Sequence, residues 1–363
     1  MTRVHINGKW LAQPVTGTQR YAAAMVEAII SSDRLQLVVH LPSGVEVPES
    51  MLRSTVRIRR APVSGILFEQ CYLPVATAGE LLLNFAGPAP LLKRRQLVTM
   101  HDATPFRYPS TFSWAFVSFY AVMYWLLGRT ARKLLTVSQF SATELSSVLR
   151  IPASRFIVAG CAADALCAVR SRRLELGLTG DHYLVVATRA RHKNLVTPLK
   201  AVAESGRDVV VVGGCGGDQV FAGTSSLDEQ ATLTGRVQDE ELVWLYRNSR
   251  ALIFPSKYEG FGLPPLEAQT LGCPVVCSTA ASLPEVCGDG AIYFDPDDPG
   301  TLLAALDRLE SEPGLADELR SRGLANSQRF SWESSARKVV EWVESDSRTD
   351  HDQILMRGGH ARR

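Results

Sequence analysis

The stretch ALIFPSKYEGFGLPPLEAQTLGCPVVCS, residues 251–278, decides the fold that the sequence predicts. The apolar runs at its two ends have the composition of short buried strands. Between them a glycine-containing loop leads into a short helix, because Pro264 and Pro265 are tolerated in a first helical turn and Gly272 is placed to end the helix. The stretch therefore predicts strand, loop, helix and strand, which is one unit of a parallel α/β sheet.

The loop in this stretch has the composition of an anion site. Free backbone amides at the start of a helix bind anions such as phosphate, and glycines let a ligand approach the backbone closely. The amides available before the prolines are those of Gly260, Phe261, Gly262 and Leu263. Glu259 and Glu267 flank the loop, and a carboxylate that accepts two hydrogen bonds suits the vicinal hydroxyls of a ribose or a hexose. A single glutamate is more often a cap or a surface residue, but two around such a loop favour a ligand site.

Similar β-branched runs alternate with amphipathic segments along most of the chain. The other expected strands are 35–41, 96–100, 133–137, 183–187 and 208–212, and the expected helices include 19–30, 141–149, 240–247 and 302–310. This alternation predicts an α/β fold with two doubly wound Rossmann-like domains, residues 1–165 and 166–345, facing across a cleft. Ligands are expected in the loops after the strands. Residues 346–363 are polar and are predicted to form a flexible tail.

Composition excludes several other classes of protein. The 363 residues are 46% hydrophobic and 21% charged, which is typical of a globular protein and not of a disordered chain. Seven scattered cysteines, an odd number, indicate reduced thiols and not a disulfide framework. The sequence shows neither a secretory signal nor a run of 18 apolar residues, so we expect a cytoplasmic location. The spacing of Cys273, Cys277 and Cys287 does not predict a metal site, since the residues between the first two have the composition of a buried strand.

Charge is distributed unequally between the two predicted domains. Residues 1–165 contain 17 Lys and Arg against 9 Asp and Glu, a formal charge of +8, whereas the remainder has 22 against 28, a charge of −6. The first domain therefore has either an anionic partner, such as an acidic small molecule or a membrane surface, or simply a solvated basic face.

An aromatic stretch in the first domain leads to a separate hypothesis. Residues 112–127 contain seven aromatic side chains, and Arg129, Arg132 and Lys133 follow them. The stretch is too short to span a bilayer, so it forms either a buried core helix or a helix that lies in the membrane interface. Further basic residues are Arg53, Arg57, Arg59, Arg60, Lys93, Arg94 and Arg95. The hypothesis is that this domain docks peripherally on the anionic inner face of the cell membrane and takes a lipid-diphosphate glycan as acceptor.

Several motifs together connect the chain with a known family. Besides the Glu-x7-Glu pattern with Gly-Phe-Gly after its first glutamate, they are TGTQRYA (16–22), HDATPF (101–106), LLTVSQFSATEL (134–145), RARHKNL (189–195), TGRVQDEELVWLYRNS (234–249) and FSWESSARKVV (330–340). In these motifs the sequence resembles the group 1, or family 4 (GT4), retaining glycosyltransferases of the GT-B fold. The resemblance covers residues 1 to about 345. It implies that the first domain binds the acceptor, that the second binds a nucleotide sugar, and that the last helix, about 331–345, crosses back to the first domain.

The resemblance also implies roles for residues of the second domain. Glu267 would bind the donor ribose, and Glu259 would contact the transferred sugar. Lys193 matches the lysine that neutralises the donor diphosphate, with Arg189 or Arg191 helping. A cation there stabilises the leaving group more in the transition state than in the ground state. Thr197-Pro198 departs from the family pattern and indicates that the next helix starts after Asn194, because proline clashes with the preceding helical turn.

In the first domain the resemblance implies a catalytic histidine. His101 would reach the sugar in the cleft, and Asp102 would orient its ring; the alternative is a buried structural His-Asp pair. Gly17 and Arg20 would lie beside the donor, with an ordinary turn as the alternative.

These observations predict a retaining hexosyltransferase of cell-surface polysaccharide biosynthesis. The donor is expected to be GDP-mannose, because the N-terminal segment resembles bacterial mannosyltransferases, with UDP-glucose, UDP-galactose and dTDP-rhamnose left open. The acceptor is expected to be a glycan or a lipid-linked glycan. No metal, additional cofactor or nucleic acid is predicted.

Two other classes of function remain open from the sequence. An NAD-dependent oxidoreductase or epimerase of Rossmann type would share the architecture, although the glycine run at 213–217 fails the dinucleotide fingerprint because Gln219 stands at the third glycine position. A non-catalytic scaffold with the same GT-B fold would bind a nucleotide without transferring sugar.

Overall fold

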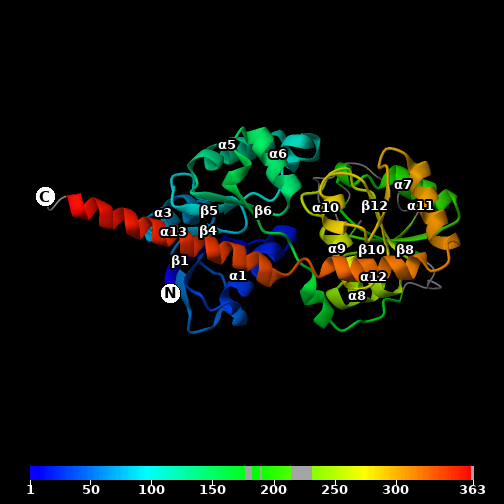
Figure 1. Ribbon diagram of the computed structural model, residues 1–363, viewed down its shortest axis with the longest axis horizontal. Helices are drawn as coiled ribbons and strands as arrows, with labels where there is room; N and C mark the ends of the chain where they lie inside the picture. The colour runs from blue at the N-terminus through cyan, green and yellow to red at the C-terminus, as the bar shows by residue number, and fades with distance from the viewer. Residues whose placement is uncertain (176–181, 189, 214–230, 361–363) are drawn as a thin grey trace.

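The structure consists of two parallel α/β domains joined by two crossings of the chain (Figure 1). The computed structural model describes residues 1–175, 182–188, 190–213 and 231–360, with side chains described up to Arg348. The elements of the two sheets come from residues 2–158 and 182–294, so the domain boundary expected at 165/166 falls between the sheets. None of the helices in the described ranges combines the length and apolar composition that a membrane crossing needs.

Each sheet is wholly parallel and has the doubly wound strand order. Among the described residues the first sheet runs β3-β2-β1-β4-β5-β6-β7 and the second runs β10-β9-β8-β11-β12-β13. The first contains β1 (Thr2–Asn7), β2 (Leu35–Leu41), β3 (Val56–Arg60), β4 (Leu82–Asn84), β5 (Gln96–Thr99), β6 (Lys133–Thr136) and β7 (Phe156–Val158). The second contains β8 (His182–Val186), β9 (Asp208–Val212), β10 (Thr232–Gly235), β11 (Leu252–Phe254), β12 (Val275–Ser278) and β13 (Ile292–Phe294).

Helices cover both faces of each sheet, and their apolar sides form the cores with the strands. Those of the first domain are α1 (Gly17–Ser31), α2 (Gly65–Leu67), α3 (Leu73–Ala76), α4 (Thr104–Arg107), α5 (Trp114–Thr130) and α6 (Gln139–Leu149). The later ones are α7 (Val196–Glu204), α8 (Asp239–Asn248), α9 (Leu263–Thr270), α10 (Leu283–Cys287), α11 (Pro299–Ser311), α12 (Leu315–Ser327) and α13 (Trp332–His360). Helix α7 begins after Asn194, as Pro198 predicts.

Helix α13 returns to the first domain, whereas α12 lies on the second (Figure 1). Ser335 and Lys338 donate hydrogen bonds to the carbonyls of Gly160 and Val158, at 2.7 and 2.9 Å. Val339 is fully buried in the core that α13 shares with α1. Helix α13 continues to His360, into the segment from residue 346 that the sequence predicts to be a flexible tail. This segment contains no proline and no glycine before position 358, so nothing in it ends a helix.

Replacing Val339 by alanine tests whether α13 is part of the first domain's core. Removing two methyl groups from a site that is 0% exposed should lower the free energy of unfolding by about 1–3 kcal/mol. Urea unfolding followed by tryptophan fluorescence measures this change. Val122→Ala, at a valine that is 59% exposed, is the matched control and should change stability by less than about 0.5 kcal/mol. Equal effects of the two substitutions would contradict the docking of α13.

Candidate active site

The strand order itself locates the candidate site in the second domain. In an open parallel sheet, ligands bind beyond the carboxyl ends of the strands at the point where the strand order reverses. In the second sheet this point lies between β8 and β11, which are direct neighbours. The segment after β8 carries Lys193, and the loop after β11 carries Glu259. The two segments that the sequence selected are therefore brought together by the topology.

Lys193 and Glu259 form an ion pair at this switch point. The lysine Nζ lies 2.7 Å from Oε1 of the glutamate, and the side chains are 18% and 12% exposed. The ammonium group also lies 5.7 Å from the ring centroid of Phe254 at the end of β11. Asn194, in the left-handed region with φ +54°, donates hydrogen bonds to the carbonyls of Pro255 and Pro296. These bonds tie the residue next to Lys193 to the loops after β11 and β13.

The glycine loop opens α9 in the way the sequence predicts. Gly262 is the N-cap of α9 with φ +95°, and a Cβ there would lie 2.6 Å from Cδ2 of Leu283, so only glycine fits without strain. The helix ends at a Schellman motif, in which the amides of Gly272 and Cys273 bond back to the carbonyls of Gln269 and Ala268. Within the described residues, four backbone amides of the loop donate no hydrogen bond, those of Gly260, Phe261, Gly262 and Leu263. They are available to an anionic ligand.

Glu267 lies one turn into α9 and has a different environment from Glu259. Its Oε2 accepts a hydrogen bond of 2.8 Å from the hydroxyl of Tyr246 on α8. Burial raises the pKa of Glu267, although the Tyr246 hydrogen bond and the charge of Arg20 act in the opposite direction. A partly buried carboxylate with one occupied oxygen has acceptor capacity left for a hydroxyl group.

Arg20 and Gly17 lie at a pocket between the domains. The pocket has a volume of about 400 Å³ and is lined by the start of α1 and by residues 236–240 before and at the start of α8. Arg20 Nη2 lies 2.9 Å from Oδ1 of Asp239, so an ion pair between half-exposed side chains connects the domains. Asp239 was not singled out by the sequence, because its partner is 219 positions away. Arg20 and Gly17 therefore face the second domain, as a role beside the donor requires.

His101 follows β5 and is enclosed by other side chains. Its ring packs edge-on against Tyr21 at a centroid distance of 5.0 Å, and its Nε2 is buried without a partner among the described residues. Burial lowers the pKa of His101, and the charge of Asp102 opposes this shift. Asp102 Oδ1 accepts a hydrogen bond of 2.7 Å from the amide of Thr104. The unpartnered nitrogen leaves His101 able to bond a ligand.

The glycine loop is held against the first domain by contacts that the sequence did not reveal. The carbonyl of Gly260 accepts hydrogen bonds from Ser138 and Ser141 at the start of α6, at 2.5 and 2.9 Å. A Cβ on Gly260 would lie 2.7 Å from Cβ of Asp102. Glu285 of α10 accepts the first two amides of α6, those of Gln139 and Phe140, at 2.7 and 2.9 Å. Ser138 could have been recognised as a helix N-cap, but its partner in the other domain could not.

Two further cations, Arg189 and Arg191, are predicted to help Lys193 bind the diphosphate. Arg191 is exposed, and no ion pair engages it within the described residues. Arg189 lies outside the described residues, as do the glycines at positions 214, 216 and 217. His192, between the two basic positions, is buried, and burial together with Lys193 lowers its pKa. In the part of the chain that the structure describes, no group of His, Cys, Asp and Glu could hold a metal ion.

The switch point of the first sheet carries a second set of polar side chains, which the sequence did not single out. Asn7 at the end of β1 donates a 3.0 Å hydrogen bond to Oδ1 of Asn84 at the end of the neighbouring β4. Lys9 forms an ion pair of 2.5 Å with Glu69, whose side chain is 3% exposed. We call these four residues the first-domain polar cluster. They occupy the position at which an open α/β sheet binds ligands.

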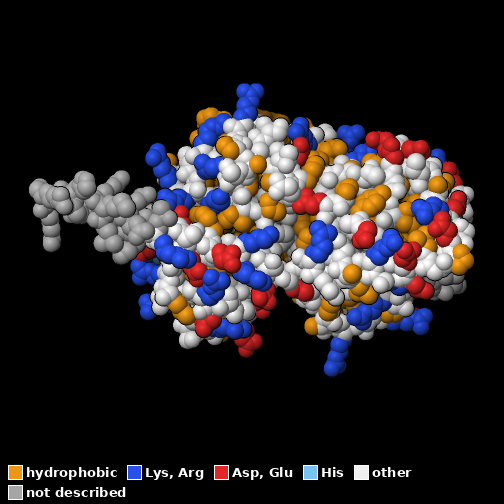
Figure 2. Space-filling view, viewed as in Figure 1, with side chains coloured by type: hydrophobic (Ala, Val, Ile, Leu, Met, Phe, Trp, Pro, Cys, Tyr) orange, Lys and Arg blue, Asp and Glu red, His pale blue; other side chains and the backbone are white. Residues whose placement is uncertain are grey.

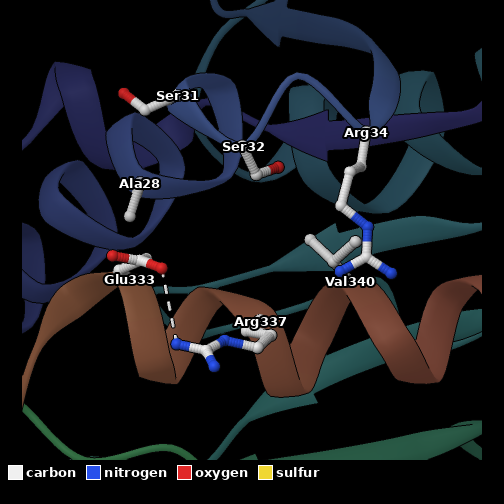
Figure 3. Close-up of a pocket in the computed structure, with 7 residues that line it drawn as sticks. All are labelled: Ala28, Ser31, Ser32, Arg34, Glu333, Arg337 and Val340. Carbon is white, nitrogen blue, oxygen red and sulfur yellow. Dashed lines mark hydrogen bonds and ion pairs between the residues drawn. The ribbon is translucent and has the colours of Figure 1, made fainter.

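A further pocket lies away from the predicted site residues. It has a volume of about 480 Å³ and lies between the end of α1 and the first turns of α13 (Figure 3). In the close-up, Glu333 and Arg337 pair along α13, and Arg34 approaches from the other wall. Arg34 is itself paired with Glu344, so the basic groups of this pocket have carboxylate partners.

Comparison with known proteins agrees with this geometry. Residues 172–329 match the sequence model of the family described as glycosyl transferases group 1. Sucrose-phosphate synthase from Thermosynechococcus elongatus superposes with a TM-score of 0.74 at 18% identity, covering 96% of this chain and 100% of that one. Anabaena Alr3699/HepE, solved in complex with UDP-glucose, gives 0.71 at 17% identity, covering 95% and 100%. The fold is therefore GT-B, as predicted, and the residues that match the family model lie within its second domain.

The chain resembles the group 1 glycosyltransferases in this match as well as in its motifs. It is 33% identical over 232 residues to O-antigen chain mannosyltransferase B of Escherichia coli, covering 58% of this chain and 60% of that protein. It is 26% identical over 262 residues to O-antigen chain mannosyltransferase RfbU of Salmonella typhimurium, covering 70% of each. The match to the first of these spans less than two thirds of that relative's length.

Opposite stability changes are expected for the two glutamates. Because burial raises the pKa of Glu267 above 4.5, the folded state holds its proton more tightly than the unfolded chain does, so stability falls as pH rises above that value. Glu267→Gln should therefore raise the thermal midpoint near neutral pH, and the gain should vanish toward pH of about 4.5. Glu259→Gln should lower the midpoint, because Lys193 loses its partner. Thermal unfolding across pH measures both; a lower midpoint for Glu267→Gln at neutral pH would contradict this.

Two glycine substitutions distinguish the contact between the two domains from the contact between the protein and the donor. Gly260→Ala should lower the thermal midpoint, because its Cβ would collide with Asp102 and push the loop away from the first domain. Gly17→Ala meets nothing within 4 Å and should keep the midpoint, while weakening nucleotide-sugar binding if the glycine makes room for the donor. Calorimetric unfolding and titration with a nucleotide sugar measure the two effects. An unchanged midpoint for Gly260→Ala would show that this contact is dispensable.

Proposed function

We propose that this protein is a retaining glycosyltransferase that transfers a hexose from a nucleotide diphosphate sugar to a glycan or lipid-linked glycan during cell-surface polysaccharide assembly. The observation that carries the proposal is the set of groups at the second switch point: the Lys193–Glu259 ion pair beside four unpaired loop amides. An ammonium group and free amides are what a diphosphate needs, and a carboxylate is what sugar hydroxyls need.

The proposed roles follow from these positions. Lys193, helped by the exposed Arg191, neutralises the charge that develops on the diphosphate as the glycosidic bond breaks. A bound diphosphate competes with Glu259 for the ammonium group and so frees carboxylate oxygens for the hexose. Glu267, which keeps one oxygen on Tyr246, binds the ribose. His101, neutral because its pKa is lowered, presents its unpartnered Nε2 to the sugar from the first domain.

Departure of the leaving group and attack of the acceptor are proposed to occur on the same face of the sugar. The incoming hydroxyl would then pass its proton to the departing phosphate oxygen while the new glycosidic bond forms. This retaining course is carried over from the family and not from the geometry. The role of the first domain is to present the acceptor, and the first-domain polar cluster is its proposed contact.

The proposed donor is GDP-mannose. Its support is that the two curated relatives described above are named as O-antigen mannosyltransferases. For the acceptor we propose a glycan or lipid-diphosphate glycan, reached by peripheral contact of the first domain with an anionic membrane at the cytoplasmic face. The basic excess of residues 1–165 supports this contact.

A thermal-shift panel of GDP-, UDP- and dTDP-sugars tests the donor assignment. We expect GDP-mannose to stabilise the wild-type protein and Glu267→Ala to lose most of that shift, because the ribose loses its acceptor. At ligand concentrations about 100 times the Kd the stabilisation amounts to about 2.7 kcal/mol. Stabilisation by NADH alone would favour the oxidoreductase class instead.

Release of nucleoside diphosphate with and without a glycan acceptor distinguishes an enzyme from a scaffold. Acceptor-dependent release that falls at least about a hundredfold in Lys193→Ala is the expected result, because the leaving group loses its counter-charge. Lys200→Ala, at an exposed lysine on α7, is the matched control and should keep the rate. Binding of the sugar nucleotide without acceptor-dependent release would indicate a scaffold.

A further inference from the structure

Helix α5 is apolar on two opposite faces, and only one of them is covered. Met123, Tyr124 and Leu127 pack into the core of the first domain. The other face is exposed, with Trp114 81%, Phe119 52%, Val122 59% and Trp125 51% accessible. A helix that is hydrophobic all round is expected to be enclosed. One side of α5 is therefore a buried core face, and the other is an exposed apolar face that the core does not cover.

The exposed side chains form one continuous stripe. Trp114, Val122, Trp125 and Arg129 recur at helical spacing, so they lie on the same side of the helix. The guanidinium carbon of Arg129 lies 4.3 Å from the ring centroid of Trp125, which covers the tryptophan's face with a cation. The 17 residues of α5 extend over about 25 Å, shorter than the roughly 30 Å of a bilayer core. The geometry suits a helix that lies along a surface.

Cations without carboxylate partners gather at the C-terminal end of this stripe. Arg129 bonds to the carbonyls of Trp125 and Leu149, and Lys133 bonds to that of Ser154. The two other cations of the group are Arg150 and Arg155. Within the described residues, none of these four forms an ion pair with a carboxylate. In Figure 2, hydrophobic and basic side chains lie next to one another along the upper rim of the first domain, where Figure 1 places α5.

We propose that the exposed face of α5 docks flat on an anionic lipid bilayer. Tryptophans prefer the interfacial region, and lipid phosphates neutralise the unpaired cations. A second copy of the chain is a poorer occupant, because a symmetric contact would bring the same cations to the interface. The docking itself needs no assumption about catalysis.

The position of α5 connects this surface with the candidate site. The chain before α5 contains Tyr108, whose ring contacts His192 and Tyr258 of the second domain at centroid distances of 5.9 and 5.5 Å. On its inner side, burial and then the negative charge of Glu69, a member of the first-domain polar cluster, raise the pKa of Tyr120. Docking therefore brings both the domain junction and this cluster close to the bilayer. The next step rests on the proposed function: the acceptor is lipid-anchored, with its tail in the bilayer and its sugar at the domain junction.

Vesicle binding by the full-length protein tests the docking. The probes are vesicles of phosphatidylcholine with phosphatidylglycerol, and vesicles of phosphatidylcholine alone, at low salt. We expect wild-type protein to sediment with the anionic vesicles. The Trp114→Gln, Trp125→Gln double variant should bind these vesicles at least about tenfold more weakly. Arg129→Gln with Arg150→Gln should weaken binding to the anionic vesicles only. Leu324→Gln, at an apolar side chain on α12 that is 44% exposed, is the matched control and should bind like wild type.

Two outcomes would overturn the proposal. One is equal vesicle binding by wild type and by the tryptophan double variant with unchanged thermal midpoints. The other is a wild-type dimer that ignores vesicles and becomes monomeric in the double variant, since α5 would then be a subunit interface.

The membrane docking and the proposed function can be contradicted separately. Vesicle binding is measured without donor, so it survives even if no nucleotide sugar binds. If transfer is detected, the double variant should lose it about tenfold for an acceptor embedded in vesicles and keep it for a water-soluble acceptor. Equal loss with both acceptors would contradict the lipid-anchored acceptor while leaving the docking intact.

Discussion

The contact between the Gly260 turn and the start of α6 is the constraint on which the arrangement of the molecule depends. One carbonyl accepts two serine hydroxyls from the other domain, and the carboxylate of Glu285 accepts the first amides of the same helix. Because the turn also opens α9, the contact places the free loop amides and both glutamates next to the first domain. A side chain at Gly260 would separate these surfaces. The candidate site therefore exists only as a joint product of two domains that fold on separate sheets.

Electrostatics at the site are arranged for a ligand and not for stability alone. Burial raises the pKa of Glu267. The ammonium group of Lys193 forms its ion pair with Glu259 where water has little access. Partly buried charges of this kind cost free energy unless they are paired, so a protein selected only for stability would replace them. Their presence beside unpaired amides is what a diphosphate sugar would use. The same reasoning applies to α5, where exposed tryptophans next to unpaired cations suit a lipid surface better than water.

Much of the fold could be predicted because parallel α/β proteins have strong local signals. Strands at 35–41 and 208–212 have the observed bounds, since β-branched residues bury well on both faces of a parallel sheet. The end of α9 just before Gly272 and the late start of α7 follow from backbone chemistry within a few residues. The extent of α13 beyond residue 346 could not be predicted, because a polar composition does not by itself show where a helix ends. The polar cluster of Asn7 and Asn84 was missed, because it depends on which strands are neighbours.

The sequence by itself determined the βαβ order, the glycine loop with its flanking glutamates, and the apolar character of α5, because each rests on spacing along the chain. Tertiary structure alone decided which groups meet: Lys193 with Glu259, Arg20 with Asp239, and the Gly260 turn with α6. It also decided which face of α5 is covered, since periodicity shows that a helix is apolar but not how much of it the core can enclose. These contacts join residues far apart in the chain, and only the order of the strands brings them to one edge.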